Sequence, residues 1–248
     1  MEPLWDYAWS DDSNKFVIIS AKTDGPGPET VDRKSLLVVQ KYDIPKPELP
    51  SGRIPVIING NNIFLHPSFL HIDWSRDGST IAAARMATVY ILSPTSAKPI
   101  SSIEYTPEVL AGNITTFGNG FSGIGLSPDG KRIAISNESG VSVFKGKAGL
   151  SFYDLEKSTS DPVCDIQFKQ FECLFSWSSN GKAIAVCNGA GRETADVEFV
   201  DIRSHRVTHH LHPSRKEMGL GSRLLKWSPD GAELAMLGRG GPLLFWQV

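Results

Sequence analysis

The chain has little cysteine and no long apolar run, and these two absences exclude several classes of protein. Its 248 residues include only three cysteines, Cys164, Cys173 and Cys187. So few cysteines, odd in number, favour reduced thiols over a disulfide framework. The N-terminal segment has no basic stretch followed by an apolar one, so no secretory signal is expected there. No stretch approaches the ~20 apolar residues of a membrane-spanning helix. We therefore expect a cytoplasmic protein.

A strong charge of either sign is also lacking. The 25 Lys and Arg nearly balance the 27 Asp and Glu, giving a net charge of −2. The molecule as a whole therefore has no electrostatic bias toward nucleic acid or an anionic membrane. Phosphate-binding loops, dinucleotide fingerprints and nucleophile elbows are not found, so we expect no cofactor.

What the chain does contain is an internal repeat. One pattern recurs roughly every 50 residues after a longer first interval, a period typical of repeat architectures. The five copies read AWSDDSNKFVIIS from Ala8, DWSRDGSTIAAAR from Asp73, GLSPDGKRIAISN from Gly125, SWSSNGKAIAVCN from Ser176 and KWSPDGAELAMLG from Lys226. The second residue of each copy, Trp9, Trp74, Leu126, Trp177 or Trp227, is called its anchor below.

Each copy is typical of a β-hairpin. Asp or Asn follows the anchor by three residues, and glycine comes next in four of the five copies. Asp-Gly and Asn-Gly supply the positive φ angles of two-residue β-turns, so the pattern predicts two strands joined by such a turn. Small residues after the turn, such as Ala82, Ala134 and Ala185, suit close packing between neighbouring sheets.

Two further strands are expected after each hairpin. The expected third strands end in Lys41-Tyr-Asp-Ile, Val89-Tyr-Ile-Leu, Phe152-Tyr-Asp-Leu, Phe199-Val-Asp-Ile and Leu244-Phe-Trp-Gln-Val. The expected fourth strands are Arg53-Ile-Pro-Val-Ile-Ile, Lys98-Pro-Ile-Ser-Ser-Ile-Glu-Tyr, Pro162-Val-Cys-Asp-Ile-Gln-Phe and Arg206-Val-Thr-His-His-Leu-His. The fifth copy is expected to lack its fourth strand, because the sequence stops at Val248.

The Tyr-Asp-Leu and Val-Asp-Ile endings resemble the Trp-Asp dipeptide of WD40 repeats, and the Trp-Ser-Pro-Asp-Gly turns are similar to those of WD40 and TolB-like propellers. The resemblance covers essentially the whole chain, although no blade shows a clear Gly-His signature and no third strand carries a true Trp-Asp. It implies an all-β fold: a single β-propeller domain over residues 1–248 with about five blades of four-stranded antiparallel sheet, the last lacking its outer strand. The approximate blades are 1–65, 66–106, 118–169, 170–213 and 221–248.

Long insertions indicate where such a scaffold would bind. Propeller geometry puts the connections from second to third strand, and from one blade to the next, on one face. The long ones are Ala21–Ser35, Thr106–Gly120, Asn137–Gly149, Asn188–Ala195 and His212–Ser222. The proline-rich segment Asp43–Gly52 is expected on the opposite face.

The residues that end the second strands, Ser20, Arg85, Asn137, Asn188 and Gly238, should surround the opening on the insertion face. Arg85, together with Arg192 and Arg239, is expected to bind an acidic or carbonyl-rich segment. Phe117 and Phe121 either anchor a partner or close the rim beneath their own loop. The candidate partner-binding residues are therefore Arg85, Phe117, Phe121, Asn137, Asn188, Arg192 and Arg239.

Catalytic and metal-binding alternatives have less support. Asp73 and Asp165 are candidate acid and base residues, but the positions equivalent to Asp73 in the other copies are not acidic. His210 and His212 would share one strand face without an obvious third ligand, so we expect no metal site. Arg203, Arg206 and the basic residues after them form a local basic tract, best explained as a solvated surface.

The sequence therefore favours a non-enzymatic WD40-like scaffold for a protein or peptide. The alternatives are a hydrolase or lyase with a central funnel site, and an accessory half of a larger assembly. The strand at Leu243–Val248 is expected to leave an open edge available for pairing with another β-strand.

Overall fold

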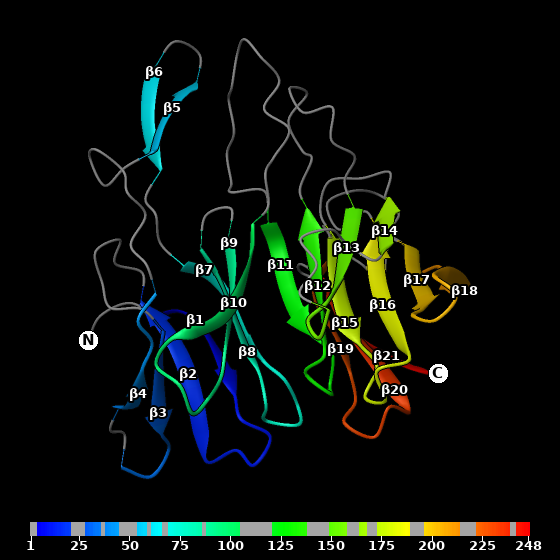
Figure 1. Cartoon of the computed structure of the whole chain (residues 1–248). Helices are drawn as coiled ribbons and strands as arrows, with labels where there is room; N and C mark the ends of the chain where they lie inside the picture. Colours follow the sequence, from blue (N-terminus) through cyan, green and yellow to red (C-terminus); the bar gives the residue numbers. More distant parts are fainter. Residues whose placement is uncertain are drawn as a thin grey trace. The chain divides into compact units, whose positions relative to one another are not determined.

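The structure is a computed structural model that carries side chains (Figure 1). It describes residues 4–20, 28–35, 38–44, 54–58, 61–65, 69–85, 88–104, 121–137, 149–157, 164–167, 173–188, 196–213, 222–238 and 242–248. These residues form β-strands, turns and extended segments, and no helix occurs among them. The all-β class predicted from the repeat is therefore confirmed.

Among the described residues, five antiparallel sheets of three or four strands follow one another, besides one two-stranded hairpin. The first contains β1 (Leu4–Trp9), β2 (Lys15–Ser20), β3 (Glu29–Asp32) and β4 (Val38–Lys41). The second contains β7 (Phe69–Trp74), β8 (Ile81–Arg85), β9 (Thr88–Leu92) and β10 (Pro99–Glu104). The third contains β11 (Phe121–Leu126), β12 (Arg132–Asn137), β13 (Gly149–Asp154) and β14 (Cys164–Gln167).

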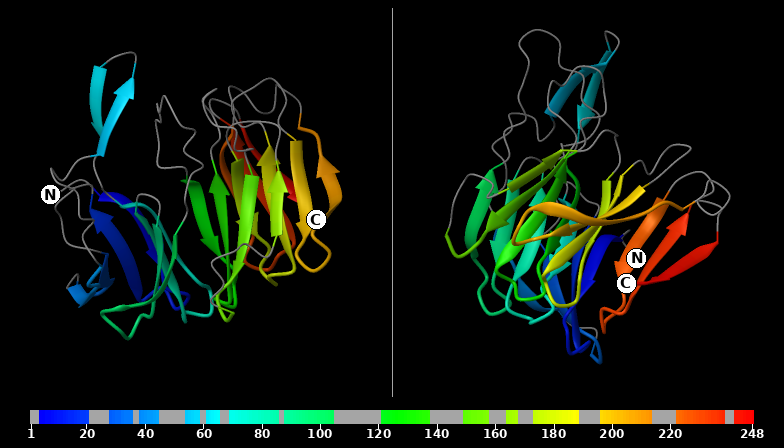
Figure 2. Two further views of the ribbon diagram at one scale, coloured as in Figure 1. Left: turned by 45° about the horizontal axis from the view of Figure 1, so that its top comes forward. Right: turned by 90° about the vertical axis from the view of Figure 1, so that its right-hand side faces the viewer.

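The fourth sheet contains β15 (Cys173–Trp177), β16 (Ala183–Asn188), β17 (Asp196–Asp201) and β18 (Arg206–Leu211). The fifth has three strands among the described residues: β19 (Ser222–Trp227), β20 (Glu233–Gly238) and β21 (Leu243–Gln247), with β21 at its edge (Figure 2, right). In every sheet the strands pair in chain order, so repeated four-stranded meanders give a propeller-like fold.

The first sheet differs from the prediction. The segment that ends at Lys41 is the fourth strand, and the third strand is β3, inside the predicted loop Ala21–Ser35. The segment Arg53–Ile58, predicted as the fourth strand, instead supplies β5 (Ile54–Ile58), which pairs with β6 (Asn61–Leu65) in a separate hairpin. The remaining predicted third and fourth strands are confirmed, and the fifth sheet has three strands among the described residues.

The hairpin turns also differ from the prediction, because they are longer than two residues. In the second sheet the Gly78 N–H donates to Ser75 O (3.0 Å) and the Ser75 N–H donates to Thr80 O (2.9 Å). Only Gly78 in this turn has a positive φ, +74°. A two-residue type I′ turn would need two such residues. Gly130, Gly181 and Gly231 occupy the same position, and Ser13 takes it in the first sheet with φ +53°.

The described strands fall into two compact units. The first includes the first and second sheets and the β5–β6 hairpin, and the second includes the third, fourth and fifth sheets. In the first unit Val17, Ile72, Trp74 and Leu92 belong to one buried apolar cluster between the two sheets. In the second unit Trp177 packs among residues of the third and fourth sheets, and Leu234 and Met236 pack against the fourth.

Candidate functional site

The two ends of each sheet have different chemistry. At the end with the Asp-Gly turn, the polar side chains bond to one another and to the turn backbone. The Ser75 hydroxyl donates to Asp77 Oδ1 (2.7 Å) and accepts from the Thr80 N–H (2.9 Å). The Ser79 N–H donates to the same carboxylate oxygen (3.0 Å). These side chains therefore stabilise the turn itself.

The same arrangement recurs in the other four sheets. The serine after each anchor donates to the Asp or Asn two residues later: Ser10 to Asp12 (2.6 Å), Ser127 to Asp129 (2.6 Å), Ser178 to Asn180 (2.9 Å) and Ser228 to Asp230 (2.6 Å). The hydrogen bonds from Ser10 and Asn14 lower the pKa of Asp12 to about 2. Burial acts to raise the pKa of Asp77, but the bonds from Ser79 and Ser75 outweigh it and lower the pKa.

A second carboxylate holds the turn between the third and fourth strands. Asp201 at the end of β17 accepts from the Ser204 N–H and hydroxyl, both at 2.7 Å, and these bonds lower its pKa. Asp32 at the end of β3 accepts from Ser35 in the same way, with distances of 2.8 Å. Both aspartates end the third strand of their sheet, and their role is to close the turn that follows.

Four of the predicted partner-binding residues, Arg85, Phe121, Asn137 and Asn188, lie at the opposite end of their sheets. The backbone register pairs Phe121 with Asn137 and Cys173 with Asn188 in the second unit, and Phe69 with Arg85 in the first. Each pair joins the start of a first strand to the end of a second strand. The side chains of Arg85, Phe121, Asn137 and Asn188 are outside what the structure describes, and Phe117, Arg192 and Arg239 lie outside the described residues altogether.

The antiparallel strand order also places the longest connections at this opposite end. It carries the connections 105–120, 138–148, 189–195 and 212–221, which lie largely outside the described residues. The turns between first and second strands remain short in every sheet. Chain length therefore varies widely among these connections, whereas it stays nearly constant in the turns between first and second strands.

The candidate acid and base residues occupy different kinds of strand. Asp73 lies on β7, the first strand of its sheet, in register with Ala82 and half-buried. Asp165 lies on β14, the outer strand of the third sheet, in register with Ser151. The two residues belong to different compact units.

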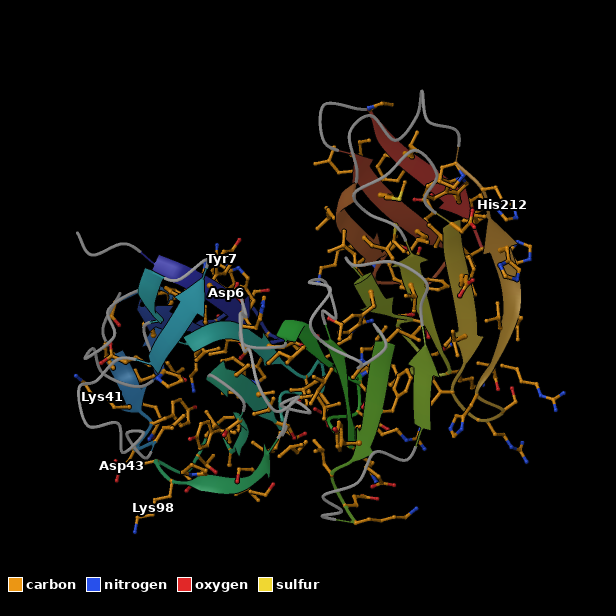
Figure 3. The ribbon with its side chains drawn as sticks, turned by 90° about the horizontal axis from the view of Figure 1, so that it is seen from above. Asp6, Tyr7, Lys41, Asp43, Lys98 and His212 are labelled. Carbon is orange, nitrogen blue, oxygen red and sulfur yellow. The ribbon has the colours of Figure 1, made fainter. Side chains whose placement is uncertain are left out.

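The histidine prediction is confirmed in its geometry. The rings of His210 and His212 stack with centroids 5.9 Å apart and planes 5° apart. His212 Nδ1 lies 2.8 Å from Asp196 Oδ1, and His210 Nδ1 lies 3.9 Å from Glu198 Oε1. His212 directly follows the outer strand β18 (Figure 3), and 70% of its side chain is exposed. Among the described residues, no group of three or more His, Cys, Asp or Glu is placed to hold a metal ion.

The sequence analysis did not predict one contact between the two sheets of the first unit. Asp6, beside Tyr7 on β1 (Figure 3), accepts from the Ile72 N–H at 3.0 Å and so ties the first sheet to the second. Burial lowers the pKa of the adjacent His71, and the negative charge of Asp6 partly opposes this effect. A single Asp three residues before an anchor gives no sequence signal for such a contact.

The sequence analysis also missed two exposed apolar faces. Tyr7 and Trp9 of the first sheet are 59% and 46% exposed, and Leu243 and Phe245 of the fifth are 49% and 59% exposed. Their equivalents in the intervening sheets are largely buried.

Comparisons with known proteins identify the fold. No family model and no curated protein matches the sequence. Among solved structures, the chain is similar to hydrazine synthase of Kuenenia stuttgartiensis, a protein that contains a β-propeller. The identity is 17%, and the match covers 94% of this chain and 55% of that chain with a TM-score of 0.63. This chain thus spans about half of that structure.

A likeness at this identity shows the fold and carries no activity with it. It agrees with the repeated antiparallel sheets, and it supports a propeller-like architecture without fixing the number of blades. The described part of the chain contains no helix long and apolar enough to cross a membrane.

Proposed function

We propose that the chain is a WD40-like β-propeller scaffold of about five blades that binds a protein or peptide without catalysing a reaction. The observation that carries this proposal is the difference between the two ends of each sheet. One end carries a turn between first and second strands that has nearly the same length in every sheet and whose polar groups bond internally, and the other bears connections of widely varying length. Loops held at the ends of rigid strands are where binding residues concentrate.

The residues at the loop-bearing end suit recognition of a peptide backbone. Asn137 and Asn188 each offer an amide donor and a carbonyl acceptor, the groups that pair with an extended peptide. Arg85 adds a planar cation that binds carboxylates in bidentate fashion. The proposed ligand is therefore an acidic or carbonyl-rich segment, with Arg192, Arg239, Phe117 and Phe121 as further candidate contacts.

A peptide selection on the intact chain tests this proposal. Peptides are selected from a random phage-displayed library, and their dissociation constants are measured for wild type, Arg85→Glu, Asn137→Ala and Asn188→Ala. We expect Arg85→Glu to weaken acidic peptides at least about tenfold, because it replaces an attractive charge with a repulsive one. Each alanine variant should weaken binding by a smaller factor.

Arg203→Glu is the matched control. Arg203 is exposed and lies in the β17–β18 turn, at the other end of its sheet. The same change of charge there should leave peptide binding within about twofold of wild type, because rim charges remote from a site contribute little. Equal losses in both variants would show that net charge governs binding, and unchanged binding in Arg85→Glu would remove Arg85 from the site.

A second binding mode is supported by the open edge of the fifth sheet. We propose that β21 pairs with a β-strand of a partner. The Val248 N–H donates to Ala232 O (3.0 Å), and alternation along an antiparallel pair then turns the Gln247 N–H away from β20. Gln247→Pro removes this outward donor and leaves the pairing with β20 intact, whereas Gln247→Ala keeps it.

The probe for this second mode is a labelled peptide with the sequence of β18, residues 206–211, which forms the outer strand of the fourth sheet. Fluorescence anisotropy should show binding to wild type and Gln247→Ala, and loss of binding to Gln247→Pro. Equal binding by all three proteins would exclude strand pairing at β21.

A further inference from the structure

The outer half of the fourth sheet carries two carboxylates on one face. Strand β17 alternates in burial: Val197 and Phe199 are buried, whereas Asp196 and Glu198 are partly exposed. Side chains along a strand point to alternate faces, so both carboxylates lie on the face opposite the two apolar residues. The register pairs Glu198 with His210 on the neighbouring strand β18. The face that carries the carboxylates therefore also carries a histidine.

The histidines at the end of β18 divide between the two faces. The ring of His209 lies against the buried phenylalanine of β17, with centroids 5.7 Å apart. The rings of His210 and His212 (Figure 3) stack on the other face, with centroids 5.9 Å apart and planes 5° apart. His212 Nδ1 lies 2.8 Å from Asp196 Oδ1, and His210 Nδ1 lies 3.9 Å from Glu198 Oε1. Two imidazoles, each beside a carboxylate of the neighbouring strand, thus share one face.

The carboxylates determine which ring nitrogen of each histidine is available. An ionised carboxylate only accepts hydrogen bonds, so the 2.8 Å contact with Asp196 requires a proton on Nδ1 of His212. A neutral imidazole protonated at Nδ1 carries its lone pair on Nε2. Glu198 favours the same tautomer of His210 at longer range. Metal-binding histidines are commonly oriented by such a carboxylate, which fixes the tautomer and makes the other nitrogen a better ligand.

We propose that His210 and His212 together bind one divalent transition-metal ion through their Nε2 atoms. Imidazole is a preferred ligand of Cu²⁺, Ni²⁺ and Zn²⁺, and Cu²⁺ forms the most stable complexes of the three. Two nitrogens at about 2.0–2.1 Å from one ion lie at most about 4 Å apart, so the rings must tilt toward each other from their stacked positions. The exposed fractions of the side chains, 49% for His210 and 70% for His212, leave room for this rotation.

The surrounding charge favours a cation over an anion. Asp196 and Glu198 place negative charge beside both rings, which attracts a metal ion and repels a phosphate or carboxylate ligand. No group of three or more His, Cys, Asp or Glu in the described part of the chain is arranged to hold a metal ion, so solvent must supply the remaining ligands. The site is therefore an open chelate, unlike the closed four-ligand sites that stabilise folds. It goes beyond the proposed function, because it needs none of the candidate peptide-binding residues.

Titration of the intact, tag-free chain with iminodiacetate-bound Cu²⁺ tests the proposal. The chelator leaves coordination positions open for protein side chains and keeps copper from weak sites with a single histidine. Electron spin-echo envelope modulation reports how many imidazoles coordinate the bound copper. We expect two in wild type. His210→Gln and His212→Gln should each weaken binding at least about tenfold, because only a pair of ligands makes the second bond intramolecular.

His209→Gln is the matched control, because it removes an imidazole from the same strand but from the opposite face. Its affinity for copper should stay within about twofold of wild type, as expected for a surface change away from the site. Asp196→Asn tests the positioning role of the carboxylate. It should keep two coordinated imidazoles and weaken binding about tenfold, the lower end of the effect of such outer partners. Circular dichroism spectra establish that all variants are folded.

Several results would overturn the proposal. One coordinated imidazole in wild type would do so, as would wild-type affinity in either His210→Gln or His212→Gln. A loss in His209→Gln equal to theirs would also overturn it, because copper would then bind the histidines of β18 regardless of their face. Excess Ca²⁺ should not displace the copper, since Ca²⁺ takes oxygen ligands. Displacement would overturn the proposal by showing that the carboxylates, and not the imidazoles, hold the ion.

Discussion

Ser13 has the positive φ that the other four hairpin turns give to glycine. A side chain in this left-handed region is strained by about 1–2 kcal/mol relative to glycine. We expect Ser13→Gly to raise the free energy of unfolding by up to about 1 kcal/mol. Gly78→Ala should lower it by a similar amount, because the added Cβ would meet no atom within 4 Å and only the backbone strain remains. Urea unfolding of both variants measures these opposite signs.

Gly125 is required for a different reason, the close approach of two sheets. A Cβ at Gly125 would lie 2.7 Å from Cε2 of Phe175, whereas a Cβ at Gly123 would lie no closer than 3.4 Å to any atom. Overpacking of this kind typically costs about 1–3 kcal/mol. We expect Gly125→Ala to destabilise the protein by that amount and Gly123→Ala by clearly less. Equal losses in urea unfolding would show that the Phe175 contact does not determine the cost of Gly125→Ala.

At the scale of elements, the anchors differ in how much they stabilise their sheets. Trp177→Phe keeps most of the buried area and leaves Gly125 O without its indole donor, which should cost about 1–3 kcal/mol. Trp9→Phe changes a ring that is 46% exposed and should cost less than about 0.5 kcal/mol at a concentration where the chain is monomeric. Chemical denaturation of the two variants tests the contrast. A large loss for Trp9→Phe would show that its indole is stabilised within the monomer.

The hairpins, anchors and most outer strands were predictable because local sequence encodes them. The first sheet was misassigned because Lys41-Tyr-Asp-Ile matched the expected ending, although Val31-Asp32 followed by Ser35 has the same turn chemistry as Val200-Asp201 followed by Ser204. The sequence predicted where the long loops begin and end, but not how their side chains are arranged, because the loop residues do not follow the repeat. Whether the face of a sheet is exposed depends on the tertiary structure around it, and the sequence of one repeat does not predict that.

At the scale of the whole molecule, carboxylates in the turns link stability to pH. The pKa of Asp12 is lowered to about 2, and the pKa values of Asp32, Asp77, Asp154, Asp201 and Asp230 are also lowered. Unfolded aspartates titrate near pH 3.9. A group with a lowered folded-state pKa contributes stability that is fully present above the unfolded value and is lost as the pH falls through the folded value. The free energy of unfolding should therefore fall between about pH 4 and pH 2.

The fourth sheet shows how to remove this sensitivity without breaking the turn. Asn180 accepts from the Ser178 hydroxyl and the Lys182 N–H, both at 2.9 Å, and carries no charge to titrate. A triple variant with Asp12→Asn, Asp77→Asn and Asp230→Asn should keep these bonds and lose less stability than wild type between pH 4 and pH 2. Urea unfolding at pH 7, 4, 3 and 2 measures how steeply the free energy of unfolding falls with pH in wild type and in the triple variant. Because Asn retains the acceptor oxygen, an equal loss of stability in the two proteins would mean that these three carboxylates do not govern acid unfolding.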